Sequence, residues 1–189
     1  MFFIILNIAY EYYKLMDDEL SFWREKCKYD PDKATENRKK FLTHTLDTNK
    51  KMELYNCAVK GDLDKLKELI EVKKFPILEE CSASGYYWTA IHYAAHYGFE
   101  NIIEYVLEYF QNHPDKKSLL NLQSNLGQSP LTICIVSSLN IEKKKKILEL
   151  YALYDAIDFS VCTNKDEDIF DLCKKHGLSH HLLNVMKED

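Results

Sequence analysis

The stretch Thr89-Ala-Ile-His-Tyr-Ala-Ala-His-Tyr-Gly98, followed by Phe99-Glu-Asn-Ile-Ile-Glu-Tyr-Val-Leu107, decides the fold. Its first part has a threonine that can cap a helix, a face of small residues and a glycine that ends a helix. Its second part has apolar residues at positions 102, 103, 106 and 107, the i, i+3, i+4 spacing of an amphipathic helix. Two short helices around one glycine predict an αα-hairpin.

The same pattern recurs along the chain, once upstream at 54–70 and twice downstream, at 127–150 and 168–183. In the alignment, one small residue falls at the same place in every copy, at spacings of 37, 40 and 39 residues: Cys57, Ala94, Cys134 and Cys173. A small residue there lets the first helices of adjacent copies approach closely. Because one hairpin is too small to bury its own apolar face, the repeats predict a solenoid whose core forms between stacked neighbours.

The run 89–98 resembles the ankyrin signature T-P-L-H-x-A-A-x-x-G, and the run 121–132 (NLQSNLGQSPLT) resembles the loop and helix start N-x-x-D-x-x-G-x-T-P-L-H of that family. The resemblance implies an all-α ankyrin-repeat solenoid of stacked helix-turn-helix units. We expect a helical N-terminal extension over 1–50 and an ankyrin-repeat domain over 51–189. Its units would cover about 51–84, 85–120, 121–160 and 161–189, and the first and last would act as caps.

The chain departs from the family pattern in three ways. Its repeats exceed the usual length of about 33 residues, so extra residues must lie in connections such as 73–84 and 111–117. The third unit has one extra residue around 138–141 and lacks the turn glycine. The second unit has Tyr87 where a turn glycine is usual.

Composition and motifs favour a non-catalytic protein. The net charge of −5 is mild and indicates no nucleic-acid partner. No phosphate-binding loop, catalytic motif or dinucleotide fingerprint is present, so we expect no enzyme activity, no cofactor and no small-molecule substrate. The six cysteines lie far apart without a C-x-x-C pair, which favours reduced thiols in a cytoplasmic protein, or a nuclear one, over a secreted disulfide framework.

The N-terminal extension begins with the apolar run 1–16, which is too short to span a bilayer and lacks the basic start of a signal peptide. We expect a helix docked on the repeats; a membrane or signal role and a true start at Met16 are the alternatives. A second helix is predicted over 16–29, with Leu20, Trp23 and Cys27 on one face. A third begins at Asp30 and Pro31 and could run to about Leu46.

Two polar features have ordinary explanations. A group near the C-terminus offers zinc-type ligands at a spacing that matches no common zinc finger: Cys162, Cys173, His176, His180 and His181. The resemblance places Cys173 in the core, so we expect no metal. The lysine run 143–146 falls on a second helix, where a solvated face is expected, with an acidic partner or RNA as the alternative.

Aromatic side chains are concentrated between positions 86 and 97. Ankyrin proteins bind partners with their loop tips and the outward positions of their first helices, which here implies a set of five binding residues: Tyr86, Tyr87, Trp88, His96 and Tyr97. Trp and Tyr are enriched at binding hot spots. Tyr93 is expected in the core, and His92 is expected to form hydrogen bonds around the turn. The alternative is that the aromatic rings pack against the long connections or the N-terminal extension.

The sequence therefore predicts an adaptor or scaffold that binds a protein partner through the concave face and loop tips of its repeats. The alternative is a structural subunit of a large cytoskeletal, ciliary or organellar assembly, docked through the N-terminal helices.

Overall fold

A computed structural model of the chain describes residues 30–81 and 85–186. The helices expected within 1–29 lie outside these residues. The described helices, in chain order, are α2 (Pro31–Phe41), α3 (Thr48–Lys60), α4 (Leu63–Lys67), the π-helix η1 (Glu68–Val72), α5 (Ala90–Tyr97), α6 (Glu100–Phe110), α7 (Lys116–Leu120), α8 (Pro130–Val136), α9 (Ile141–Leu153), α10 (Ile169–Lys175) and α11 (Ser179–Val185).

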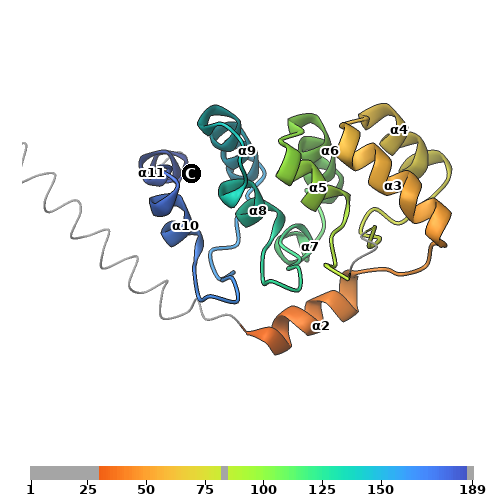
Figure 1. The fold of residues 1–189 in the computed structure, drawn as a ribbon, viewed down its shortest axis with the longest axis horizontal. Helices are drawn as coiled ribbons and strands as arrows, with labels where there is room; N and C mark the ends of the chain where they lie inside the picture. Colours follow the sequence, from red (N-terminus) through yellow and green to blue (C-terminus); the bar gives the residue numbers. More distant parts are fainter. Residues whose placement is uncertain (1–29, 82–84, 187–189) are drawn as a thin grey trace, which may run out of the picture.

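The helices form a row of hairpins, shown in Figure 1. The first helices α3, α5, α8 and α10 pack side by side in chain order, and the second helices α6, α9 and α11 form a row beside them. The loops between hairpins project to one side of the stack. The all-α repeat architecture predicted from the sequence is confirmed.

Side chains at the helix starts satisfy backbone donors that have no partner within the helix. Ser129 accepts a hydrogen bond from the Thr132 N–H, with Pro130 in the first turn of α8. Asp168 does the same for the Asp171 N–H at the start of α10. These polar residues fix where each first helix begins, and thereby the register of each repeat.

The turn between the two helices of a hairpin ends in a left-handed glycine in the first and second repeats, at Gly61 (φ 71°) and Gly98 (φ 75°). The following repeat covers each glycine closely. A Cβ added at Gly61 would lie 2.6 Å from the Phe99 ring, and one added at Gly98 would lie 2.9 Å from Leu139. Glycine at these turns therefore serves both backbone conformation and contact between repeats.

The third hairpin lacks this glycine, as expected, and uses side chains to satisfy the carbonyls at the end of α8. The Ser137 hydroxyl donates to the Cys134 carbonyl at 2.6 Å, and the Lys144 ammonium donates to the Ile135 carbonyl at 2.7 Å. Lys144 is buried as a result. The expectation of a solvated lysine run is wrong for this residue.

The core lies between the two rows of helices and runs continuously through the stack. The small residue aligned in every repeat is buried within it, at Cys57, Ala94, Cys134 and Cys173. Burial raises the pKa of the Cys134 and Cys173 thiols to about 12, so both stay neutral. These cysteines act as small apolar residues that let neighbouring helices pack closely.

Helix α2 begins as predicted, because the Asp30 carboxylate accepts the N–H groups of Asp32 and Lys33. It ends at Phe41, not near Leu46.

The early end follows from the carboxylate of Glu79, which is fully buried. It accepts hydrogen bonds from the Thr45 and Leu46 N–H groups and from the Thr43 hydroxyl, at 2.8 to 3.0 Å. These bonds hold 43–46 against the first repeat, where Thr43 forms an isolated β-bridge with Glu79, so this segment does not continue the helix.

Helix α2 itself lies across the loops of the stack (Figure 1). Its Arg38 guanidinium donates to the Gln123 carbonyl at 3.1 Å and the Ser124 carbonyl at 3.2 Å. Lys40 lies 3.5 Å from the Asp115 carboxylate. The segment 30–46 is therefore joined both to the end of the first repeat and to the loop that begins the third.

Candidate functional site

Four of the five predicted binding residues form one continuous group on the side of the loops and first helices. Tyr86 and Trp88 lie on the loop before α5, and His96 and Tyr97 lie in the last turn of α5. Tyr86 is 45% exposed and Tyr97 is 43% exposed. We call these four residues the aromatic face.

Ring contacts link the aromatic face from one end to the other. The ring centroids of Tyr86 and Trp88 are 6.4 Å apart, those of Trp88 and His96 5.7 Å, and those of His96 and Tyr97 4.9 Å. Trp88 also packs edge-on against half-buried Tyr93 at 4.9 Å. Held by these contacts, the rings lose little rotamer freedom when a partner covers them, which favours binding.

Tyr87, the fifth predicted residue, is turned toward the chain's own helix α2. The Arg38 guanidinium lies 5.0 Å from the centroid of its ring, a cation–π contact. Its backbone is left-handed (φ 59°), as at Gly127 (φ 71°) and Asp166 (φ 56°), which lie at the same place in the next two loops. Within the described part of the N-terminal extension, residues 30–50, this contact agrees for Tyr87 with the alternative in which aromatic rings meet the extension.

His92 lies beneath the aromatic face and is fully buried. Its Nδ1 accepts the Thr89 N–H at 3.1 Å, so Nε2 carries the proton and donates to the Leu122 carbonyl at 2.9 Å. Burial lowers the pKa of His92 to about 4, although the Leu122 hydrogen bond opposes this in part. His92 is a neutral structural link between two repeats, and Trp88 stacks on its ring at 6.2 Å.

Leu126 extends the face and was not predicted from the sequence. It is 47% exposed at the tip of the next loop. The Asn125 N–H donates to the Tyr86 carbonyl at 3.2 Å, which holds the two tips side by side. The repeat alignment could have indicated its place at a loop tip, because Leu126 precedes the helix cap Ser129 by the same three positions that separate Tyr86 from Thr89.

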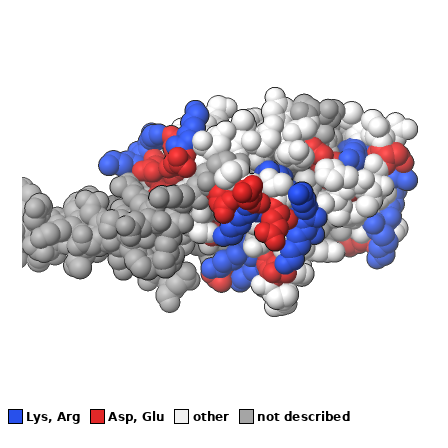
Figure 2. Space-filling model, turned by 90° about the horizontal axis from the view of Figure 1, so that it is seen from below, with Lys and Arg blue, Asp and Glu red and all other residues white. Residues whose placement is uncertain are grey.

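On the side that carries α2, the charged side chains of the described residues do not form a basic surface. Figure 2 shows positive and negative groups interspersed over the side that carries α2. In the lysine run, Lys145 pairs with Glu142 at 2.8 Å and Lys146 lies 3.9 Å from Glu100. With Lys144 buried, the run offers little free positive charge for an anionic partner.

The zinc-type residues near the C-terminus serve the fold. Cys173 is buried in the core, and His181 Nε2 lies 3.1 Å from the Glu149 carboxylate. Within 30–81 and 85–186, no group of three or more histidine, cysteine or acidic residues is arranged to hold a metal ion. No helix in these ranges has both the length and the apolar character needed to cross a membrane, and the apolar run 1–16 lies outside them.

Stacked helical hairpins with loops projecting to one side, and an aromatic surface on the loops and first helices, define a repeat solenoid of the protein-interaction class. A family model of ankyrin repeats, in three copies, matches residues 54–158. The chain belongs to the ankyrin-repeat family, whose repeats are generic protein–protein interaction modules and typically non-catalytic. No curated protein matches the chain. The hairpin of α10 and α11 follows the matched segment.

Proposed function

We propose that the chain is an adaptor or scaffold that binds a protein partner through the aromatic face and the neighbouring tip of Leu126. The observation that carries the proposal is the combination of exposure and order at Tyr86 and Tyr97. Both rings are more than two-fifths exposed, and the contacts to Trp88 and His96 hold them in place. Exposed aromatic rings held in this way are typical of binding hot spots.

The site suits an uncharged or weakly charged segment of a partner, because its contact surface is aromatic and aliphatic. Helix α2 covers one edge of it, where Arg38 holds Tyr87. The partner would therefore approach along the first helices and contact the tips of the loop before α5 and the loop before α8, which carry Tyr86 and Leu126. No group on this surface suggests catalysis.

The test uses a double variant, Tyr86→Ala with Tyr97→Ala, which removes two exposed rings without opening the core. Tyr109→Ala is the matched control, because Tyr109 is 54% exposed on α6, a second helix away from this face. Each form is used for affinity capture with mass spectrometry from the native cell. We expect proteins captured by the wild type and by Tyr109→Ala to be lost with the double variant, while the helical circular dichroism signal is unchanged. Equal capture by all three forms would show that this face does not bind the partner.

A further inference from the structure

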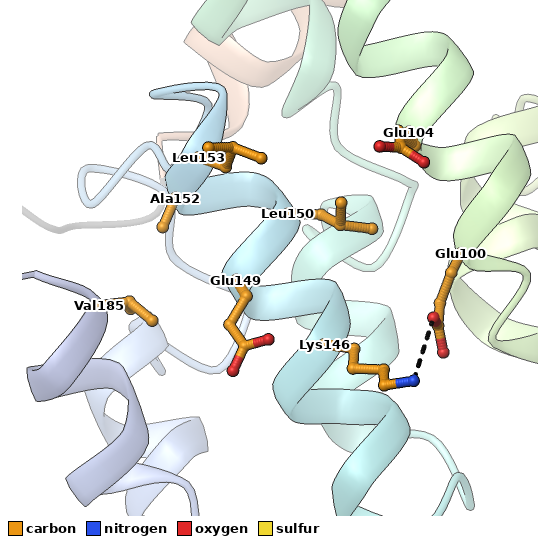
Figure 3. A pocket seen from close by; sticks show the side chains of 8 residues that line it. All are labelled: Glu100, Glu104, Lys146, Glu149, Leu150, Ala152, Leu153 and Val185. Atoms are coloured by element: carbon orange, nitrogen blue, oxygen red, sulfur yellow. Dashed lines mark ion pairs between the residues drawn. The ribbon is translucent and has the colours of Figure 1, made fainter. Parts of the chain in front are cut away.

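A groove of about 650 Å³ lies on the other row of helices, away from the aromatic face. Figure 3 shows it over α9, with Glu100 and Glu104 of α6 on one side and Val185 of α11 on the other. Its lining residues, among those that the structure describes, all lie on the second helices α6, α9 and α11, so binding there would leave the loops and first helices free.

The floor of the groove is apolar and open to solvent. Leu153, on α9, is 76% exposed, more than any other large apolar side chain among the described residues. Leu150 lies one turn earlier and is half-buried. A smaller hollow of about 110 Å³ shares Val185 and continues toward Phe159 and Met186. Exposed apolar side chains lining a groove mark an interaction site more often than scattered ones do.

The walls of the groove are acidic. Glu100 and Glu104 lie one turn apart on α6, and Glu149 lies on α9 with its carboxylate 3.1 Å from His181 Nε2 of α11 (Figure 3). Lys146 is the one cation among the lining residues, and its Nζ lies 3.9 Å from Glu100. Glu104 has no ion pair among the described residues. Lys146 lies beside Glu100 and His181 lies beside Glu149, so among the described lining carboxylates Glu104 is the one left open to a cation from a partner.

The charge of Glu104 is felt at the end of α9. The pKa of the Tyr154 phenol, at the end of α9, is raised by burial and further by the charges of Glu104 and Glu108. An anionic lipid surface or a nucleic acid would be repelled here. A positively charged side chain would be attracted.

We propose that this groove binds a basic amphipathic segment of a partner protein. Apolar side chains of the segment would cover Leu150 and Leu153, and a Lys or Arg side chain beside them would meet Glu104. Apolar burial supplies affinity, and the charge pattern selects basic partners over acidic ones. The proposal does not depend on the aromatic face, because the two surfaces use different helices.

The test uses the full chain and a fluorescent synthetic peptide of about 14 residues, or roughly four helical turns. The peptide carries leucine along one helical face and lysine on both sides of it, and a control peptide has glutamate in place of every lysine. Binding is followed by fluorescence anisotropy. We expect the lysine peptide to bind, its affinity to fall as salt is added, and the glutamate peptide not to bind.

Charge reversal locates the binding site. We expect Glu104→Lys to weaken binding by about tenfold, whereas Glu36→Lys, an equal charge change at an exposed position of α2, leaves it nearly unchanged. Leu153→Ser removes apolar contact without changing charge and is expected to weaken binding as well. Glu104 has no described ion pair to lose and Leu153 is largely exposed, so both variants are expected to fold.

Several results would overturn the proposal. If Glu104→Lys and Glu36→Lys weaken peptide binding equally, the peptide responds only to the net charge of the protein and not to this groove. Equal binding of the two peptides would mean unspecific apolar contact. Loss of peptide binding in the Tyr86→Ala, Tyr97→Ala variant would place the peptide on the aromatic face. If the free chain sediments as a dimer that Leu153→Ser dissociates, the occupant is a second copy of the chain.

Discussion

Acid is expected to weaken the contact between the second and third repeats through His92. The folded state holds this imidazole neutral, with a pKa of about 4 against an ordinary value of 6.5. Between these two values the unfolded chain binds more protons than the folded chain, so stability falls as the pH falls. The stabilisation is complete above pH 6.5 and lost by about pH 4. When the pH is lowered from about 7.5 to about 5, His92 is expected to reduce the free energy of unfolding by about 2 kcal/mol.

The assay compares urea unfolding of the wild type and His92→Gln at both pH values, followed by circular dichroism. Glutamine does not titrate and cannot replace both hydrogen bonds of the ring, so the variant is less stable at neutral pH. The gap between the two proteins is expected to narrow by about 2 kcal/mol at the lower pH. His113→Gln, at an exposed histidine after α6, is the control for the loss of a histidine side chain.

The reasoning is refuted if the gap for His92→Gln does not change with pH. That result would mean that the folded protein protonates His92 as readily as the unfolded chain does. Proton titration of the wild-type imidazole by NMR gives an independent reading, in which the His92 ring is expected to stay neutral at pH 5.

Two further predictions concern stability in urea unfolding. Gly61→Ala and Gly177→Ala introduce the same left-handed backbone strain (φ 71° at both), which costs about 1 kcal/mol. Only at Gly61 would the new Cβ also lie 2.6 Å from the Phe99 ring, so we expect Gly61→Ala to lower the free energy of unfolding by about 1 to 3 kcal/mol more than Gly177→Ala does. Equal losses of stability in the two variants would contradict the packing argument. Glu79→Gln removes the buried charge that holds 43–46 and is expected to cost about 3 kcal/mol, whereas Glu53→Gln breaks an exposed pair with a lysine and is expected to cost less than about 1 kcal/mol. Similar losses for the two glutamate variants would show that the Glu79 network contributes little.

The repeat architecture could be predicted because its determinants are local. A cap, a small residue and a turn glycine recur at fixed offsets, as in Thr89, Ala94 and Gly98, and each has a direct steric or hydrogen-bonding reason. The same alignment placed Tyr87 where a turn glycine is usual, and the structure shows a left-handed backbone there (φ 59°).

Contacts between distant parts of the chain could not be predicted in this way. Arg38 meets carbonyls 85 and 86 residues further along, and no periodic pattern reports such a meeting. Lys144 lies in a run of four lysines, yet it is buried because its ammonium donates a hydrogen bond to the Ile135 carbonyl, at the end of a helix whose turn has no glycine. At the proposed binding surface, residue type pointed to the five aromatic and histidine side chains, but only the structure separates Tyr87 from the other four.

The attachment of α2 at two places along the stack has a mechanical consequence. In most solenoids each repeat contacts only its neighbours, so the molecule can bend and stretch like a spring. Here 43–46 are held at Glu79 near the first repeat, and Arg38 is held at the loop that begins the third. Because the segment 38–46 is attached at both places, we expect it to resist any movement that separates the loop before α5 from the loop before α8. We therefore expect the distance between the tips of Tyr86 and Leu126 to vary little, so that a partner binding both tips, as proposed, would need no rearrangement of the loops.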